Sequence, residues 1–286
     1  MSAALPGLPG SATDPGSGPA ETAALDGLLD DGGAARVPLA AALAAHRDLR
    51  DGPDQDLVAT LVVPAAAAAE LATLLGPADL GLRVLLAASG PTALPDLLAA
   101  RSALIDADLV EVVGLRLPLP AGPDPARAAL ALLAGLDATV PAWITLPPGV
   151  PAAALDVLAG DGAENVAVDL AGTPPAALAA LLRDLVDRDL PFRAAGADGL
   201  GRGASGVPGA LQVLCAVRAA LNGAEVPELA RILAADDPAG LTSVVRRMSA
   251  ADAAVTRAFL PAVEVADAPT AVADLRLLGL SPDTFS

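Results

Sequence analysis

Short apolar runs recur along the chain from residue 57 onward, at intervals of about 25–30 residues. Each run is rich in Leu, Val and Ile and is mostly apolar on both faces, which is typical of strands in a parallel sheet covered by helices. Alanine-rich segments of helical length lie between the runs. The pattern predicts seven strands, at Leu57–Val63, Leu82–Ala88, Leu109–Leu115, Val140–Leu146, Asn165–Leu170, Pro191–Ala195 and Phe259–Val265.

The alternation changes near the C-terminal end of the chain. Helices predicted at 226–235, 238–248 and 250–257 follow one another with no clear strand between them. Alternating strands and helices predict the α/β class, and seven strands are one fewer than a regular (β/α) barrel needs. We therefore predict an irregular or incomplete (β/α) barrel of the TIM type. The alternative is a doubly wound open parallel sheet.

The N-terminal part of the chain has a different composition. Residues 1–35 are rich in Gly, Pro, Ala, Ser and Asp, which predicts a flexible tail. A helix is predicted over Val37–Leu49, with Pro38 suited to its first turn. Residues 36–286 are then expected to form a single α/β barrel-like domain. The N-terminus has no basic segment followed by an apolar one, so no targeting signal is predicted. Four prolines interrupt the longest charge-free stretch, 138–155, which excludes it as a membrane helix.

Composition excludes several kinds of chemistry. All 17 basic residues are arginine and there is no tyrosine, so a Schiff-base lysine, a Walker lysine and a catalytic tyrosine are excluded. One histidine, His46, and one cysteine, Cys215, predict no metal cluster and no internal disulfide. Cys215 falls on the apolar stripe of a predicted helix, where a buried thiol is expected. A single cysteine fits a reducing, cytoplasmic compartment.

The formal charge of the chain is -17, from 34 acidic and 17 basic residues. Such an acidic surface favours solubility and repels phosphate backbones and anionic lipids. We therefore expect a soluble protein that binds neither nucleic acid nor membranes.

Polar residues near the C-terminal ends of the predicted strands are the first candidates for a site, because barrel enzymes carry their chemistry there. Asp169 and Arg193 fall on neighbouring predicted strands, whose spacing is about 5 Å. Arg193, and Arg116 on the third predicted strand, would suit a carboxylate or phosphate, with Asp169 orienting Arg193. The alternative interpretation is a structural ion pair between Asp169 and Arg193. Other polar residues at strand ends are Ser89, Thr145, Asp198 and Glu264.

Two glutamates lie within predicted strands. Glu111 is in the third strand and Glu264 is near the end of the last. A buried carboxylate with a raised pKa would suit a general base, so Glu111, Asp169 and Glu264 are weak catalytic candidates. The alternative for Glu111 is an ion pair with Arg83 on the second strand. No catalytic role is expected for His46, which lies outside the alternation of strands and helices.

A glycine-rich loop follows the sixth predicted strand. Gly201, Gly203 and Gly206 match the pattern G-x-G-x-x-G between a strand and a helix, where backbone N–H groups can bind phosphate. No clear following strand ends in an acidic partner for a ribose, which argues against dinucleotide binding. Simple anion binding and a mobile loop or lid are the remaining interpretations.

Four segments resemble an uncharacterised (β/α)-barrel-like family of high-GC bacteria, to which no activity is assigned. They are DLVATLVVP at 56–64, LPFRAAG at 190–196, GALQVLCAVRAALNGA at 209–224 and ADLRLLGL at 273–280. The resemblance covers roughly four-fifths of the chain. In that family a Lys-x-Arg-type segment ends the fifth strand and Gly-Leu-His-His follows the sixth. This chain has Val-Asp-Leu at 168–170 and Gly-Ala-Asp-Gly at 196–199, so the resemblance implies a divergent or inactive member.

Two functional hypotheses follow. The first is a divergent barrel that at most binds a small anionic metabolite or acts as a scaffold. The second is a metabolic enzyme of lyase or isomerase type, with a carboxylate base (Glu111, Asp169 or Glu264) and an arginine anion clamp (Arg193 and Arg116). The absence of lysine, tyrosine and a second histidine favours the first. The sequence identifies no cofactor and no oligomeric state.

Overall fold

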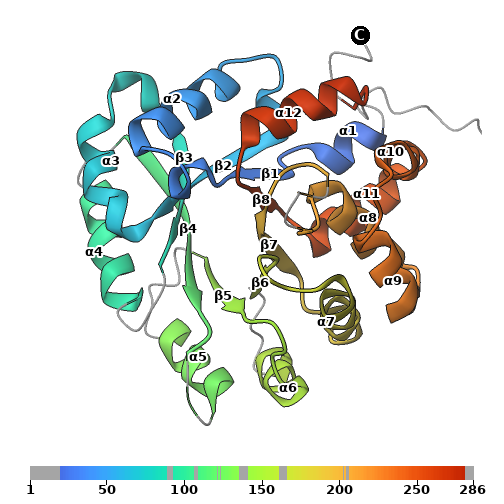
Figure 1. Ribbon diagram of the computed structural model, residues 1–286. Coiled ribbons are helices and arrows are strands. Elements are labelled where there is room, and N and C mark those ends of the chain that lie inside the picture. Colours follow the sequence, from blue (N-terminus) through green and yellow to red (C-terminus); the bar gives the residue numbers. More distant parts are fainter. Residues whose placement is uncertain are drawn as a thin grey trace, which may run out of the picture.

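The computed structural model describes residues 20–88, 93–105, 109–120, 122, 124–134, 141–160, 166–201, 203 and 206–280. Eight parallel strands pair in chain order and close into a barrel, with helices around the outside (Figure 1). This is a TIM-like (β/α)₈ barrel. The predicted fold class is confirmed, the alternative of an open doubly wound sheet is wrong, and the barrel lacks no strand.

Each of the seven apolar runs predicted as a strand overlaps an observed strand. The bounds are β2 Val58–Pro64, β3 Leu82–Ala87, β4 Val110–Pro118, β5 Ala142–Leu146, β6 Val166–Asp169, β7 Phe192–Ala197 and β8 Val263–Val265. The last strand is much shorter than predicted, because Phe259 ends the preceding helix instead of beginning the strand.

The strand missing from the prediction is β1, Leu29–Asp31, which pairs with β2 on one side and with β8 on the other. A short helix, α1 Ala20–Leu25, precedes it. This part of the predicted tail therefore belongs to the barrel, and the count of seven strands is wrong. Three residues, two of them aspartates, are too few to show the period of a strand, although all three are buried.

Helices cover the barrel between successive strands. Their bounds are α2 Leu39–Arg50, α3 Ala68–Leu74, α4 Ala93–Ile105, α5 Pro125–Ala134, α6 Ala152–Gly160, α7 Pro175–Asp187, α8 Ala210–Leu221 and α12 Ala268–Leu277. Single turns of 3₁₀ helix are η1 Gly33–Ala35, η2 Gln55–Leu57, η3 Ala65–Ala67 and η4 Pro77–Asp79.

Three further helices lie between β7 and β8, after α8. They are α9 Val226–Leu233, α10 Pro238–Arg246 and α11 Ala250–Phe259, with no described strand between them, as predicted. All three pack against α8, on the side of the barrel near β7 and β8 (Figure 1). The three helices therefore thicken the outer layer beside the seam where β8 meets β1.

The apolar core fills the space between the strands and the helices. It is built almost entirely from Leu, Val and Ala, as in Leu61, Val84 and Leu182, which are fully buried. Side chains on the opposite face of each strand point into the barrel. Several of these inner positions are polar or charged, and they form the candidate site.

Candidate functional site

Two ion pairs cross the inside of the barrel. Arg116 on β4 pairs with Glu264 on β8, and Nη2 of Arg193 on β7 lies 3.5 Å from Oδ2 of Asp30 on β1. Neither pair joins neighbouring strands, so the side chains can meet only through the interior of the closed barrel. The exposed fractions of the four side chains are 17%, 12%, 13% and 4% in that order. The lumen therefore holds two balanced pairs of buried charges.

Trp143 on β5 holds the guanidinium group of Arg193. The Cζ atom of Arg193 lies 4.7 Å from the centroid of the indole ring, a cation–π contact worth about 0.5–2 kcal/mol. The ring also packs directly on the backbone of Gly114 on β4, where an added Cβ would lie 2.1 Å from the ring atom Cζ3. Because Gly114 has no side chain, β4 leaves room for the indole ring of Trp143. In this position the ring contacts the guanidinium group of Arg193.

Arg193 has hydrogen-bonding capacity that its neighbours do not use. Its Nε and Nη1 atoms are buried and have no acceptor among the described residues. The contact of 3.5 Å with Asp30 is an ion pair that is too long for a good hydrogen bond. A guanidinium carries five N–H donors, so Arg193 keeps donors for which the described residues supply no acceptor.

Asp30 is a carboxyl group with an altered affinity for protons. Burial raises its pKa above the usual value, Arg193 opposes this, and the charge of Glu264 adds to it. Glu264 stands next to Asp30 in the register of β8 and β1. The Oδ1 atom of Asp30 has no hydrogen-bond partner within the described part of the chain. Asp30 therefore accepts a proton more readily than an exposed aspartate does.

Arg257 from α11 lies toward the N-terminal end of the barrel. Its guanidinium donates to the backbone oxygens of Leu260 and Asp26, which precede β8 and β1. Burial lowers the pKa of Arg257 to about 10, with Asp30 and Asp26 opposing the shift. At neutral pH the guanidinium group of Arg257 keeps its charge. A further positive charge therefore lies on the N-terminal side of Asp30 and Arg193.

The predicted pairing of Asp169 with Arg193 is wrong. Asp169 stands in register with Ala195, and Arg193 stands in register with Ala167, two residues earlier. Arg193 is the second residue of β7, so it lies inside the barrel and not at the C-terminal rim. Asp169 instead accepts a hydrogen bond of 2.9 Å from the backbone N–H of Ala171 in its own loop.

The two predicted glutamates lie in different places. Glu111 forms an ion pair of 3.9 Å with Arg83, and both side chains are more than half exposed near the start of their strands. This ion pair is the alternative that the sequence left open for Glu111. The carboxylate of Glu111 therefore lies away from the C-terminal rim of the barrel. Glu264 packs against Gly32, which follows β1, so its carboxylate faces the C-terminal side. Ser89 lies outside the described residues.

The glycine-rich loop folds back on itself. The N–H group of Gly203 donates to the oxygen of Val207, and the N–H group of Gly206 donates to the oxygen of Gly203. Gly201 precedes this turn, and residues 202, 204 and 205 lie outside the described part of the chain. The loop therefore uses the amides of Gly203 and Gly206 to hold its own shape.

The first turn of α8, which follows this loop, also has its amides occupied. The N–H groups of Ala210 and Leu211 donate to the backbone oxygens of Gly199 and Leu200. Gly209 donates to a side chain within the same turn. These amides already have acceptors, so the helix N-terminus does not offer a ready phosphate site.

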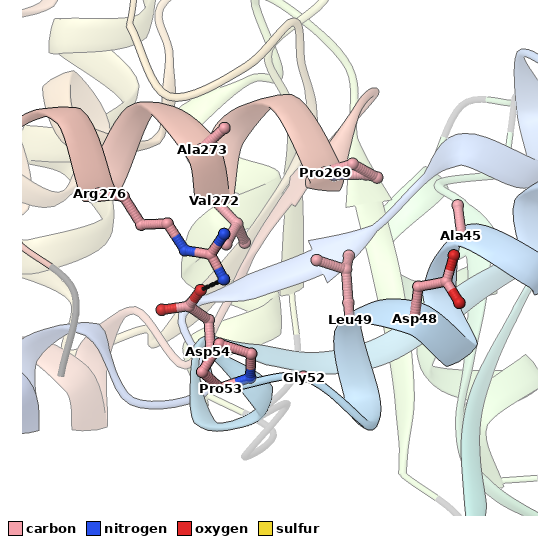
Figure 2. Close-up of a pocket in the computed structure, with 10 residues that line it drawn as sticks. All are labelled: Ala45, Asp48, Leu49, Gly52, Pro53, Asp54, Pro269, Val272, Ala273 and Arg276. Carbon is pink, nitrogen blue, oxygen red and sulfur yellow. Dashed lines mark ion pairs between the residues drawn. The ribbon is translucent and has the colours of Figure 1, made fainter. Parts of the chain in front are cut away.

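A separate pocket of about 310 Å³ lies outside the barrel, between α2 and α12 (Figure 2). Arg276 of α12 reaches across it to Asp54, which is 1% exposed, in an ion pair. The rest of the lining is mostly aliphatic, and it includes Ala45 and Val272. The ion pair ties the last helix to the segment before β2, and the pocket shares no residue with the charged lumen.

His46 of α2 is buried beside Asp31, with 3.1 Å between Nδ1 and Oδ2. Asp31 follows Asp30 in β1, so its side chain points outward to the helix layer while that of Asp30 points inward. The second oxygen of Asp31 accepts a hydrogen bond from the N–H group of Gly33. The pair ties α2 to the end of β1 and lies apart from Arg193.

The remaining candidate chemistry is limited. Among the described residues, no group of three or more His, Cys, Asp or Glu side chains could hold a metal ion. None of the helices described here is long and apolar enough to cross a bilayer. Cys215 is buried, as predicted, and burial raises the pKa of its thiol to about 12. This thiol is therefore a poor nucleophile at neutral pH.

Asp30 and Trp143 are the site residues that the sequence did not single out. Asp30 was hidden in the stretch predicted as a tail. Trp143 carried a usable signal, because it alternates with Ala142 and Ile144, whose side chains face the helices. An aromatic residue at an inner position of a strand is expected to fill the lumen.

The fold and the lumen together define a class, a (β/α)₈ barrel whose interior holds two arginine–carboxylate pairs and a tryptophan. Neither the comparison with protein-family models nor the comparison with curated proteins finds a match for this chain.

Proposed function

We propose that this barrel binds a small anionic metabolite in its lumen, with Arg193 and Arg116 as the cationic contacts. The observation that carries the proposal is the state of Arg193, which Trp143 holds in place while two of its buried nitrogen atoms, Nε and Nη1, lack an acceptor among the described residues. A buried donor without a partner costs about 1–3 kcal/mol. A carboxylate or phosphate oxygen that reaches Arg193 would recover this free energy and would match the planar guanidinium.

Arg116 supports the same proposal from the C-terminal side. Its side chain is 17% exposed and its partner Glu264 is 12% exposed, so the pair keeps partial contact with the solvent. An incoming anion can exchange with Glu264 for the guanidinium of Arg116 before it reaches Arg193. The net charge of -17 disfavours anions around the whole molecule, so binding depends on direct contacts with these two arginines.

The test is a thermal-shift screen against phosphorylated and carboxylate metabolites. At a concentration of about 100 times Kd, a ligand stabilises the folded state by about 2.7 kcal/mol. For a chain of this size that raises Tm by roughly 5–10 °C. We expect Arg193→Ala to lose the shift and Arg83→Ala to keep it, because Arg83 lies at the start of β3 and is exposed. Failure of every compound to stabilise the parent, or an equal response of Arg193→Ala, would contradict the proposal.

A second candidate function is proton transfer at a carbon next to a carboxylate, as in a lyase or isomerase. The observation that favours it is the pair of carboxylates Asp30 and Glu264, side by side in register and close to two arginines. Because burial raises the pKa of Asp30, this group suits a general base better than Glu264, which Arg116 holds. The test is exchange of α-hydrogens of carboxylate metabolites in D₂O, followed by NMR. Exchange that Asp30→Asn does not reduce would exclude this role.

A further inference from the structure

The charges inside the lumen are balanced before any ligand binds. Arg116 and Arg193 carry two positive charges, and Asp30 and Glu264 carry two negative charges. An anion that enters adds a charge without a counterion to a region that excludes most water. Such a charge is costly in a medium of low polarity unless it is neutralised. The free energy of anion binding is therefore most favourable when a positive charge enters with the anion.

A proton is the simplest positive charge to add, and Asp30 is the group best placed to receive it. Glu264 accepts a hydrogen bond from Arg116, whereas the contact of Asp30 with Arg193 is 3.5 Å long. The Oδ1 atom of Asp30 has no partner among the described residues. The groups that act on Asp30 are Arg193 from β7, Glu264 from β8, Thr60 from β2, Arg116 from β4 and Arg257 from α11.

We infer that an anion bound at Arg193 enters together with one proton, which Asp30 takes up from the solvent. The inference rests on the proposed anion binding and adds its coupling to pH. The bound anion neutralises Arg193, which is the main charge that favours ionised Asp30, and it brings a negative charge close to the carboxylate. Both effects favour the protonated form of Asp30. By linkage, protonation of Asp30 strengthens anion binding by the same factor.

The direction of the pH dependence follows from this linkage. The pKa of Asp30 is already above 3.8 in the free protein because of burial, and anion binding raises it further. Between the free and bound values, anion affinity rises as pH falls, by up to about tenfold per pH unit. Below the free value and above the bound value, affinity is independent of pH.

Methanesulfonate and sulfate are suitable probes, because neither changes its charge between about pH 5 and about pH 8. Trp143 is the only tryptophan and the chain has no tyrosine, so protein fluorescence reports directly on the ring that carries Arg193. Calorimetric titration in two buffers with different ionisation enthalpies counts the protons taken up. We expect net proton uptake, approaching one proton for each anion bound inside this window.

Two variants test whether the proton is taken up by Asp30 itself or by other groups in the barrel. Asp30→Asn keeps the shape of the side chain but cannot take up the proton, so we expect tighter anion binding with no pH dependence and no proton uptake. Asp169→Asn removes a carboxylate that makes its hydrogen bond within its own loop, so we expect the pH dependence to persist. The fluorescence of Trp143 establishes that each variant is folded before titration.

The outcomes distinguish this inference from the function on which it rests. If neither these probes nor the screened metabolites bind the parent protein at any pH, the proposed function is wrong and the inference falls with it. If they bind with an affinity that does not change with pH, or without proton uptake, anion binding stands and the proton coupling is wrong. A pH dependence that persists in Asp30→Asn assigns the proton to another group and also overturns the inference.

Discussion

Gly114 is the residue on which the position of Trp143 depends. The indole packs on the backbone of β4 at a place where a Cβ atom would overlap it, at 2.1 Å from Cζ3. The same ring carries the guanidinium of Arg193 at 4.7 Å. The absence of a side chain at Gly114 on β4 therefore determines the position of the Trp143 ring on β5. Through this ring it also affects the position of the Arg193 guanidinium on β7.

Gly114→Ala is expected to push the indole out of this position. Overpacking of a filled interior costs about 1–3 kcal/mol, and the displaced ring would lose its contact with Arg193. Urea unfolding followed by tryptophan fluorescence measures the loss of stability and the changed surroundings of Trp143 together.

Gly160→Ala is the matched control, because Gly160 is the last residue of α6 and a Cβ there would meet nothing within 4 Å. Alanine in a helix is more favourable than glycine by about 0.5–1 kcal/mol, so this variant should be as stable as the parent or more stable. An unchanged emission spectrum and stability in Gly114→Ala would contradict the described packing.

At the scale of single residues, the sequence indicated several charged residues of the site but not which of them form ion pairs with one another. Arg193, Arg116 and Glu264 could be singled out because they are charged residues within buried runs. Their pairing could not be predicted, since it depends on which residues share a level inside the closed barrel. Asp169 and Arg193 differ by two positions in register, a distance that no local pattern encodes.

At the scale of elements, α2 is tied to the segment before β3 by a buried carboxylate. Asp79 in η4 is fully buried, and Arg47 of α2 binds both of its oxygens, with distances of 2.7 Å from Nε and 2.6 Å from Nη2. The N–H group of Gly76 adds a hydrogen bond of 2.8 Å. The hydrogen bonds from Arg47 lower the pKa of Asp79 below its usual value.

Arg47→Met is expected to destabilise the protein by about 3 kcal/mol at neutral pH, because it leaves a buried carboxylate without its counterion. A carboxyl group with a lowered pKa contributes stability at neutral pH, and this contribution is lost as pH falls through that pKa. The difference between variant and parent should therefore shrink below about pH 4. Urea unfolding at several pH values measures it.

Arg127→Met is the control for this prediction. Arg127 pairs with Asp124 on the surface, and both side chains are more than half exposed. An exposed pair contributes only about 0–1 kcal/mol. Equal costs for the two variants, or a cost of Arg47→Met that does not depend on pH, would show that Asp79 is not held as described.

The elements themselves could be predicted where burial leaves a regular pattern. Strands β2 to β7 pack against helices on one face and line the lumen with the other, so they appear in the sequence as mostly apolar runs. Each predicted run overlaps its strand, and β2, β4 and β7 extend one to three residues beyond the predicted end. The three consecutive helices after α8 were also recognised. Strand β1 was not, because two of its three residues are aspartates that make buried contacts on opposite faces of the sheet.

At the scale of the whole molecule, closure of the barrel depends on β1. This strand is the only link between β2 and β8 within the described chain, and Leu29 stands in register with Val58 and with Val263. The site depends on it as well, because Asp30 enters the lumen from this strand. The prediction of a (β/α) barrel was correct, but the barrel was expected to be irregular or incomplete, because the strand that closes it was assigned to the tail. The predicted cytoplasmic location and the lack of nucleic-acid binding stay predictions.

Removal of residues 1–35 is expected to abolish cooperative unfolding, because it leaves β2 and β8 without a shared neighbour. Leu29→Ala tests the same strand more gently. Leu29 is fully buried, so the cavity should cost about 2–5 kcal/mol in urea unfolding. Leu80→Ala, at a side chain that is 74% exposed, should change stability by about 0.5 kcal/mol or less. A truncated protein that unfolds like the full chain would show that β1 is dispensable.

The seam between β1 and β8 also constrains the order of events during synthesis. The ribosome releases β1 before the other seven strands of the barrel, but its partner at 263–265 emerges after all of them. Until then the nascent chain carries an open sheet, with unpaired backbone groups on β1 and on whichever strand was made last. Such edges pair readily with other chains. We therefore expect a translation product that stops before residue 263 to aggregate more readily than the chain that includes β8.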